Sequence, residues 1–390
     1  MPQTRDRYLP LSVPFIGEEE KAEMLAVLDS GWLSTGPGTK QFEEDLAGYL
    51  GAKHAAALSS CTAGLHLALL ALNVGPGDEV ITSPFTFVST ANVILHAGAR
   101  PVFADIRRDT YNISPAEVEA KITGKTKAVI PVHYAGQPCD MDEIAALAER
   151  HSLGVIHDCA TAIGARYKDR LVGSNERDIV VFSFYANKTM TTGEGGALVT
   201  GRSDVADTVR LLSLHGMDRN AWKRYSRSGS WFFEVNAPGY KCNMTDMQAA
   251  LGRCQLRRLK DFIAKREEIC RLYDEAFEGL EEITTPVVLP CVRSSRYIYP
   301  VLLDCSRLTM DRDRFITQLR EMNIGTSVHY IPVHLQPYYM NTFGYKRGDF
   351  PVAESVYDRV VSLPLFPQMS SEDAEYVVAS VKLLVEKHRS

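Results

Sequence analysis

Lys188 stands in a turn that follows a predicted strand and precedes a run of glycines. Apolar residues 179–184 predict that strand, and residues 197–200 predict a second one after the glycines of 193–196. Glycine permits the tight return that this arrangement needs. Most loop lysines are simply solvated, but an amine tethered at the end of a strand is suited to burial and to forming a Schiff base.

Small residues at positions 59–64 join a predicted strand, 55–58, to a predicted helix. They would let a phosphate approach the backbone N–H groups at the positive end of the helix. Thr62 adds a hydroxyl donor, and Ala63 follows it. Taken alone, the segment favours a plainer interpretation, which is an ordinary capped helix start.

Asp158 follows the apolar residues 154–157. An acid at the carboxyl end of a parallel strand lies where open α/β sheets bind their ligands. The alternative interpretation is a helix cap for residues 159–162, and in isolation it is at least as good.

Predicted strands and helices alternate along the part of the chain that must position these three groups. Residues 141–151, for instance, predict a helix between two strands. This rhythm predicts an α/β fold with a large, mainly parallel sheet covered on both faces. All three groups would then face one crevice. The predicted strands are residues 55–58, 79–82, 101–105, 128–132, 154–157, 179–184 and 197–200.

The pattern changes after Thr245, where apolar residues recur at helical spacing. Asn243 or Thr245 is the candidate cap of a long connecting helix. We therefore predict a large domain in residues 1–250 and a smaller α+β domain in residues 251–390, with the N-terminal segment packing near the smaller one. The second domain is predicted to contain strands at 297–303 and 326–330 and a helix near 312–322.

Composition narrows the kinds of partner. The 390 residues carry a net charge of −5 with no block of like charge, so neither nucleic acid nor a membrane is an expected partner. The eight cysteines form no C-x-x-C pair and fit no common zinc pattern, so no metal site is expected. Free thiols and a polar start, residues 1–9, predict a cytoplasmic protein.

A phosphate cradle, an acid and an amine are together the parts of a pyridoxal 5′-phosphate (PLP) site. The acid keeps the pyridine nitrogen protonated, and the amine holds the aldehyde and moves protons. On residues 29–37, 183–196 and 239–252 the chain resembles the DegT/StrS family of nucleotide-sugar aminotransferases. The resemblance extends from Leu11 to Phe366 and implies the PLP-dependent transferase fold of type I, which is the aspartate-aminotransferase-like fold.

The resemblance also implies roles for single residues. Lys188 resembles the lysine that carries PLP, and Asp158 resembles the partner of the pyridine nitrogen. His329 and Tyr330 resemble a segment that approaches the substrate, although either could be structural. The remaining contacts with PLP would come from Thr62, Ala63 and Ser183 at the phosphate, from Phe87 and Ala160 on the two faces of the ring, and from Asn243 of a second subunit. A core aromatic is the alternative for Phe87.

One departure from the family concerns Thr161, where the family usually has His or Gln near the phenolic oxygen of PLP. Threonine can still donate a hydrogen bond, but its side chain is shorter. The interaction with the phenolic oxygen would then be absent, mediated by water or supplied by another residue. Catalysis by Cys61 is not expected, since the sequence places no base beside it.

The resemblance implies an aminotransferase that moves an amino group from L-glutamate to a nucleotide-linked keto sugar. Residues 29–37, 241–246 and 131–136 look closest to the branch that makes 4-amino-4-deoxyarabinose, which implies C4 of a UDP-sugar and a product for cell-surface polysaccharide or lipopolysaccharide. A homodimer with its active site at the interface is expected. The alternatives are a PLP-binding regulatory protein without turnover and a PLP-dependent sugar dehydratase, although in that relative a histidine replaces the lysine.

Overall fold

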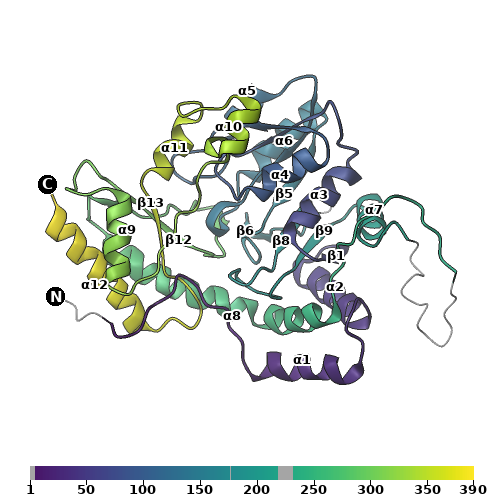
Figure 1. Cartoon of the computed structure of the whole chain (residues 1–390), viewed down its shortest axis with the longest axis horizontal. Helices are drawn as coiled ribbons and strands as arrows, with labels where there is room; N and C mark the ends of the chain where they lie inside the picture. Colours follow the sequence, from purple (N-terminus) through teal and green to yellow (C-terminus); the bar gives the residue numbers. More distant parts are fainter. Residues whose placement is uncertain (1–4, 176, 218–231) are drawn as a thin grey trace.

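A seven-stranded sheet forms the centre of the larger part of the molecule. The computed structural model describes residues 5–175, 177–217 and 232–390 (Figure 1). β9 runs antiparallel to both of its neighbours and the other neighbouring pairs are parallel, which confirms the predicted mainly parallel sheet. In spatial order the strands are β1 (His54–Leu58), β9 (Gly196–Thr200), β8 (Ile179–Ser183), β5 (Gly154–Asp158), β4 (Thr126–Ile130), β2 (Glu79–Thr82) and β3 (Arg100–Phe103).

Helices cover both faces of this sheet (Figure 1). One face packs against α3 (Cys61–Ala71), α4 (Ser89–His96) and α7 (Ser203–Ser213). The other packs against α2 (Pro37–Leu50), α5 (Pro115–Lys121), α6 (Met141–His151) and the first half of α8 (Asp246–Phe277). Because successive strand residues point to opposite faces, the near-continuous apolar runs of these strands fill both cores.

Helix α8 connects the two parts of the chain. Of the two candidate caps Thr245 is the one used: its Oγ1 accepts the N–H of Gln248 at 3.2 Å, and the Gln248 side chain accepts the N–H of Thr245 at 2.9 Å. The first half of α8 packs in the large-sheet core, and its second half packs in the core of the C-terminal region. The boundary between residues 250 and 251 stays a prediction, because one helix serves both cores.

The C-terminal region is a three-stranded antiparallel sheet packed against helices, and Leu9 of the N-terminal segment lies in its core. The strand predicted at 326–330 is wrong. Ser327 makes a single bridge to Ser362, after which the chain leaves the sheet, and the carbonyl of His329 accepts a hydrogen bond from the Tyr134 hydroxyl instead. The sheet contains β10 (Ile283–Thr284), β12 (Tyr299–Leu303) and β13 (Val360–Leu363), and the helices are α9 (Arg312–Glu321), α10 (Pro337–Phe343), α11 (Pro351–Tyr357) and α12 (Ser371–His388).

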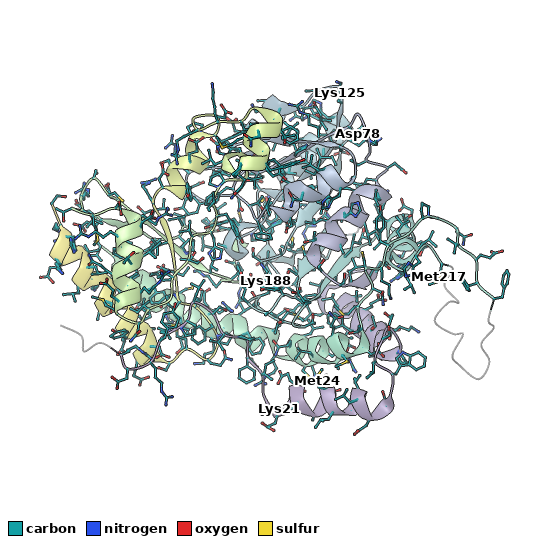
Figure 2. The ribbon with its side chains drawn as sticks, in the orientation of Figure 1. Lys21, Met24, Asp78, Lys125, Lys188 and Met217 are labelled. Atoms are coloured by element: carbon teal, nitrogen blue, oxygen red, sulfur yellow. The ribbon has the colours of Figure 1, made fainter. Side chains whose placement is uncertain are left out.

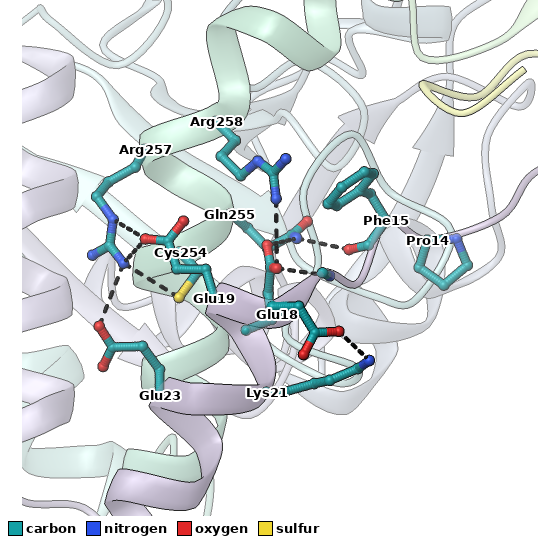
Figure 3. Close-up of polar contacts among 12 residues, drawn as sticks. Pro14, Phe15, Glu18, Glu19, Lys21, Glu23, Cys254, Gln255, Arg257 and Arg258 are labelled. Carbon is teal, nitrogen blue, oxygen red and sulfur yellow. Dashed lines mark hydrogen bonds and ion pairs between the residues drawn. The ribbon is translucent and has the colours of Figure 1, made fainter.

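Helix α1 (Glu18–Ser30) lies along α8 and is held there mainly by polar contacts (Figure 3). Glu20 is buried and accepts the side-chain amide of Gln255 at 2.9 Å, and the same amide reaches the carbonyl of Phe15 at 2.9 Å. Arg257 pairs with Glu19 beside them.

A third small sheet joins β6 (Arg166–Tyr167), β7 (Arg170–Leu171) and β11 (Val292–Arg293). Among the described helices, none is long and apolar enough to cross a membrane.

Candidate active site

The three groups singled out in the sequence meet at one edge of the large sheet. Strands β5 and β8 are parallel neighbours with Asp158 opposite Val181, so Asp158 and Ser183 both lie at the carboxyl ends of adjacent strands. Lys188 follows β8 after five residues and lies near the centre of the molecule (Figure 2). The start of α3 packs against the same strand, since a Cβ on Gly64 would come within 2.5 Å of the Val181 side chain.

Hydrogen bonds close the loop that carries Lys188 onto the sheet. The N–H of Lys188 donates to the carbonyl of Tyr185 at 2.9 Å, and the N–H of Thr192 donates to the carbonyl of Phe184 at 2.9 Å. Lys188 is half-buried, and its Nζ lies 4.6 Å from the centre of the Tyr297 ring. Lys188 is therefore fixed at its backbone while the side chain lies against an aromatic face from the C-terminal region.

Gly196 connects this loop to the predicted phosphate cradle. A Cβ at position 196 would lie 2.4 Å from the backbone nitrogen of Cys61, which is closer than any real contact. The first residue of β9 therefore lies directly against the start of α3. Only a glycine permits this approach, so the glycine-rich return and the helix start are parts of one site.

The start of α3 is capped, as the plainer interpretation of residues 59–64 predicted. The side chain of Ser60 accepts the N–H of Ala63 at 3.0 Å. Thr62 and Ala63 are half-buried at the first turn, where the helix dipole is positive. An anion here would meet Thr62 and the helix start, and Ser183 lies buried at the end of the neighbouring strand β8.

Asp158 is buried beside these groups, and burial raises the pKa of its carboxyl. Hydrogen bonds from Thr90 and from the N–H of Ala160, together with the charge of Lys188, act in the opposite direction. The described residues form no salt bridge with this carboxylate, so its charge is free to meet a cationic group of a ligand. The alternative of a helix cap does not fit, because the described residues 159–162 form a turn and not a helix. The next α-helix along the described chain is α7, which begins at Ser203.

The two aromatic residues at the mouth of the site come from different parts of the chain. The Phe87 side chain is 61% exposed, whereas Phe85 is 1% exposed, so Phe87 is not the core aromatic that the alternative interpretation required. Its ring centre lies 6.4 Å from that of Tyr330. Ala160 is half-buried next to Asp158. Phe87 and Tyr330 thus line one side of the site together.

His329 reaches the site from the C-terminal region. Its Nδ1 lies 2.9 Å from the hydroxyl of Ser362, and its carbonyl accepts from the hydroxyl of Tyr134 at 2.7 Å. Burial, together with the positive charge of Lys188, lowers the pKa of the His329 imidazole to about 4. The ring is therefore neutral at physiological pH and lies close enough to Lys188 to sense its charge.

Thr161 and Asn243 have other partners in this structure. The Thr161 hydroxyl donates to the carbonyl of His133 at 2.6 Å, so it is already engaged away from the site. The side-chain amide of Asn243 donates to the hydroxyl of Thr35, and its backbone bridges to Leu58 at the end of β1. Asn243 therefore lies at the margin of the site.

Asp246 joins two of the three segments on which the family resemblance rests. Its buried carboxylate accepts the N–H groups of Gly36, Gly38 and Thr39 at 2.8 Å each, and also the Thr39 hydroxyl at 2.6 Å. Residues 29–37 are thus tied to the start of α8.

An open groove of about 740 Å³ adjoins the site. Phe87 and Tyr330 form its edge, so the groove and the reactive groups share a wall. Aromatic and aliphatic side chains dominate the lining, with a few polar groups among them: Thr86, Phe87, Val88, Asn92, Leu95, His96, Val328, Tyr330, Ile331, Val333, Gln336, Pro337, Tyr338 and Tyr339.

Three residues of the site escaped the sequence analysis. Thr90 bonds Asp158, Tyr134 holds the carbonyl of His329, and Tyr297 covers Lys188. For Thr90 the available signal was its place three residues after Phe87, the predicted stacking residue, in the first turn of α4. Tyr134 lies in the segment 131–136 that carries part of the resemblance but had no role assigned to it, and Tyr297 carried no distinguishing signal, since each makes its contact across a long stretch of sequence.

The residues present fit PLP. They supply a half-buried primary amine, an unpaired buried carboxylate and a helix start against which a glycine strand packs. These match the aldehyde, the pyridine nitrogen and the phosphate of that cofactor.

Known proteins resemble the chain over nearly its whole length. The model of the DegT/DnrJ/EryC1/StrS aminotransferase family matches residues 14–382. The spore coat polysaccharide biosynthesis protein SpsC of Bacillus subtilis is 52% identical over 386 residues, which are 99% of this chain and 99% of SpsC.

Solved structures agree with this match. The PLP form of Spr1654 from Streptococcus pneumoniae is 35% identical, with a TM-score of 0.91 over 97% of this chain and 99% of that one. PseC of Helicobacter pylori, an aminotransferase involved in the biosynthesis of pseudoaminic acid, is 32% identical, with a TM-score of 0.90 over 98% of this chain and 100% of PseC. The fold is the type I fold of PLP-dependent sugar aminotransferases, and the chain belongs to the DegT/DnrJ/EryC1/StrS aminotransferase family.

Proposed function

We propose that this enzyme moves an amino group from L-glutamate to a nucleotide-linked keto sugar, with PLP attached to Lys188. The observation that carries the proposal is the meeting of Lys188, Asp158 and the start of α3 at one sheet edge. PLP supplies an electron sink when it is bound. The protein supplies attachment, orientation and proton transfer.

Lys188 Nζ is the proton carrier in this proposal. With PLP bound, the amine of Lys188 would take a proton from the α-carbon of the donor and would later give one to the carbon of the acceptor. The hydrogen-bonded backbone of Lys188 and the contact of its side chain with Tyr297 restrict the position of Nζ, which supports proton transfer over a short distance. His329 is neutral, and its Nδ1 is engaged with Ser362, so its Nε2 is the atom we assign to hydrogen bonding with substrate.

The other site residues bind and orient. Asp158 would hold the pyridine nitrogen with its negative charge, and Tyr330 would border the substrate. We assign the phosphate to Thr62, Ala63 and Ser183, and the two ring faces to Phe87 and Ala160.

The acceptor is proposed to be large. A groove of about 740 Å³ with an aromatic and polar lining adjoins the site, and pockets of this kind suit a ligand with a planar base and a sugar. The name of SpsC ties that relative to polysaccharide biosynthesis. We therefore propose a product for cell-surface polysaccharide or lipopolysaccharide. C4 of a UDP-sugar is proposed from the resemblance of residues 29–37, 241–246 and 131–136 to enzymes of 4-amino-4-deoxyarabinose synthesis.

The active form is proposed to be a cytoplasmic homodimer with two sites at its interface. The support is Asn243, which lies at the margin of the site and in the resembled family reaches the phosphate of the other subunit. Two-fold symmetry would then complete both sites at once. A fully active monomer in sedimentation at low concentration would contradict this arrangement.

The test uses pure enzyme with PLP, L-glutamate and matched nucleotide-linked 3-keto and 4-keto sugars, with products identified by mass. We expect the higher kcat/KM with the 4-keto compound, because the ring must lie over the cofactor to within about 1 Å, and a misplacement of that size costs about 10²-fold. A preference for the 3-keto sugar would overturn the C4 assignment. A preference for a small free keto acid would overturn the sugar acceptor.

A second measurement separates an enzyme from a mere PLP binder. The visible absorbance of bound PLP should bleach on addition of L-glutamate alone, since the first half-reaction needs no sugar. A band that persists at saturating glutamate would favour a regulatory protein without turnover.

A further inference from the structure

A hydroxyl group from α4 holds the carboxylate of Asp158. Oγ1 of Thr90 donates to Oδ2 at 2.7 Å, and the N–H of Ala160 donates to Oδ1 at 3.1 Å. The Sγ of Cys61 lies 4.0 Å from Oδ1. Thr90 is 0% exposed, so bulk water does not compete for its bond to the carboxylate.

A second hydroxyl, that of Thr86, lies next to the hydroxyl of Thr90. Oγ1 of Thr86 lies 3.0 Å from Oγ1 of Thr90, and Thr86 is also buried. A hydroxyl has one proton to donate, and an ionised carboxylate can only accept. Because Thr90 gives its proton to Asp158, the proton between the two threonines belongs to Thr86. Donation therefore runs from Thr86 to Thr90 to Asp158, and each bond polarises the next in favour of the ionised carboxylate.

The same short segment carries the aromatic residue of the site. Thr86 lies just before α4, where its hydroxyl contacts that of Thr90, while the next residue, Phe87, is largely exposed and lines the groove. The N–H of Thr90 donates to the carbonyl of Phe87 at 3.2 Å, which fixes the two residues relative to each other. One helix start thus presents both a ring-stacking group and a carboxylate-holding group.

We propose that Thr90 is a positioning residue that aims the carboxylate of Asp158 at the pyridine nitrogen of PLP, with Thr86 as the second donor. This inference rests on the role proposed above for Asp158. A neutral hydroxyl suits the position because it orients the carboxylate without cancelling its charge. A lysine or arginine there would neutralise the charge that a protonated pyridine nitrogen requires.

The charged and titratable groups near the carboxylate come from several elements, and Thr90 is the hydroxyl donor among its contacts. A change at Thr90 therefore alters the orientation of Asp158 without adding or removing a charge. Those surrounding groups are Lys188, Cys61, Cys139, Cys159 and Tyr330.

The test compares Thr90→Val, which keeps the shape but removes the donor, with Thr90→Ser, which keeps the donor. A hydrogen bond to a charged group is worth about ten- to a hundredfold in an equilibrium or rate. We expect kcat to fall by about that factor in Thr90→Val while KM for glutamate changes little, and Thr90→Ser to restore most of kcat. Titration of the apoprotein with PLP, followed by intrinsic fluorescence, should show weaker binding in Thr90→Val and recovery in Thr90→Ser.

Thr86→Val is an independent variant, for which we expect a smaller loss of kcat of about three- to tenfold, because only a neutral hydrogen bond is removed. Thr200→Val is the matched control. Thr200 is buried at the end of β9 that lies away from the site, and its hydroxyl accepts the N–H of Arg202. Its kcat and PLP affinity should match those of the wild type, and the thermal midpoint of each apoprotein reports folding.

Two results separate the inference from the function on which it rests. A Thr90→Val enzyme with wild-type kcat and PLP affinity, beside an impaired Asp158→Asn enzyme, overturns the positioning role alone. Loss in both Thr90→Val and Thr90→Ser also overturns it, because side-chain volume would then be responsible. A fully active Asp158→Asn enzyme would overturn the role proposed for Asp158 itself.

Discussion

Two buried polar clusters lie on opposite faces of the sheet at the end of β5. The front cluster contains Thr86, Thr90 and Asp158 and faces α3 and α4. The back cluster contains His133, Cys139, His157 and Asp178. His157 and Asp158 are neighbours in sequence, and strand geometry alone sends them to opposite faces.

The back cluster is built on two imidazoles that share a hydrogen bond. The N–H of Cys139 donates to Nδ1 of His133 at 3.1 Å, so the His133 proton is on Nε2 and is donated to Nδ1 of His157 at 3.0 Å. The remaining proton of His157 is then on Nε2, which lies 3.9 Å from a carboxylate oxygen of Asp178. Both rings are neutral, and burial lowers the pKa of each.

The front cluster differs in that its carboxylate accepts directly from one hydroxyl and one backbone N–H, and both of these donors are neutral. Burial is similar on the two sides, so burial alone does not mark a functional group. The difference is that the back cluster presents neutral imidazoles at the end of β5, whereas the front cluster presents a carboxylate whose charge can meet a ligand.

Lys188→Ala should have the largest effect. We expect turnover to fall by more than about 10⁴-fold, which is the upper end of what proton transfer alone contributes, because the attachment of PLP is lost as well. Borohydride reduction followed by peptide mapping should find the cofactor on Lys188 in the wild type. Lys168→Ala is the control, because Lys168 is a loop lysine paired with Asp142 at the surface. An adduct on another lysine would refute the assignment.

The second prediction compares the neighbours at the end of β5. Asp158→Asn should retain PLP but lose roughly 10²–10³-fold in kcat, as when one charge-stabilising group is removed from an active site. His157→Gln should keep a kcat near that of the wild type and lose about 1–3 kcal/mol of unfolding free energy, since it breaks the buried hydrogen bond between His133 and His157. Steady-state kinetics and urea unfolding of both variants would measure this. Equal kinetic losses would erase the distinction between the two clusters.

Acid should destabilise the back cluster. The pKa values of His133 and His157 are lower in the folded protein than in the unfolded chain, so below about pH 6.5 the unfolded chain takes up protons that the folded protein does not. Stability that is present above the unfolded pKa is therefore lost as pH falls, by about 1.4 kcal/mol per pH unit for each such proton. Urea unfolding between about pH 7.5 and about pH 5.5 should show a shallower loss in His157→Gln than in the wild type.

Local sequence was sufficient to predict most of the large sheet and the neighbourhood of Lys188. Apolar runs and glycines report strands and turns directly, and the loop from 184 to 195 closes on itself through short-range bonds. Asp158 was predicted to lie near Lys188 because parallel strands end at one edge.

Contacts between distant segments could not be predicted in this way. The bond from Thr90 to Asp158 joins residues 68 positions apart, and its distance depends on how α4 packs on the sheet. The segment at 326–330 has a strand-like composition, but its backbone partner beyond Ser327 is a tyrosine hydroxyl from the large domain rather than a neighbouring strand. Composition carries no information about such a partner.

The smallest predicted effect concerns Thr161, the position at which the chain departs from the family it resembles. Its hydroxyl donates to the carbonyl of His133, and the hydroxyl of Ser295 donates to the carbonyl of Thr161, so the residue supports the back cluster. Thr161→Val keeps the shape and removes one buried donor. We expect about 1 kcal/mol less unfolding free energy, which is the usual net worth of one hydrogen bond.

The kinetic constants of Thr161→Val should stay at wild-type values, because the hydroxyl that is removed points to His133 and not to the cofactor. Urea unfolding and steady-state kinetics with glutamate measure the two halves of this prediction on the same protein. A tenfold fall in kcat without a loss of stability would mean that the hydroxyl turns toward the bound cofactor and takes over the interaction that His or Gln makes in the family. The front and back clusters would then share Thr161, and they would no longer be separate in function.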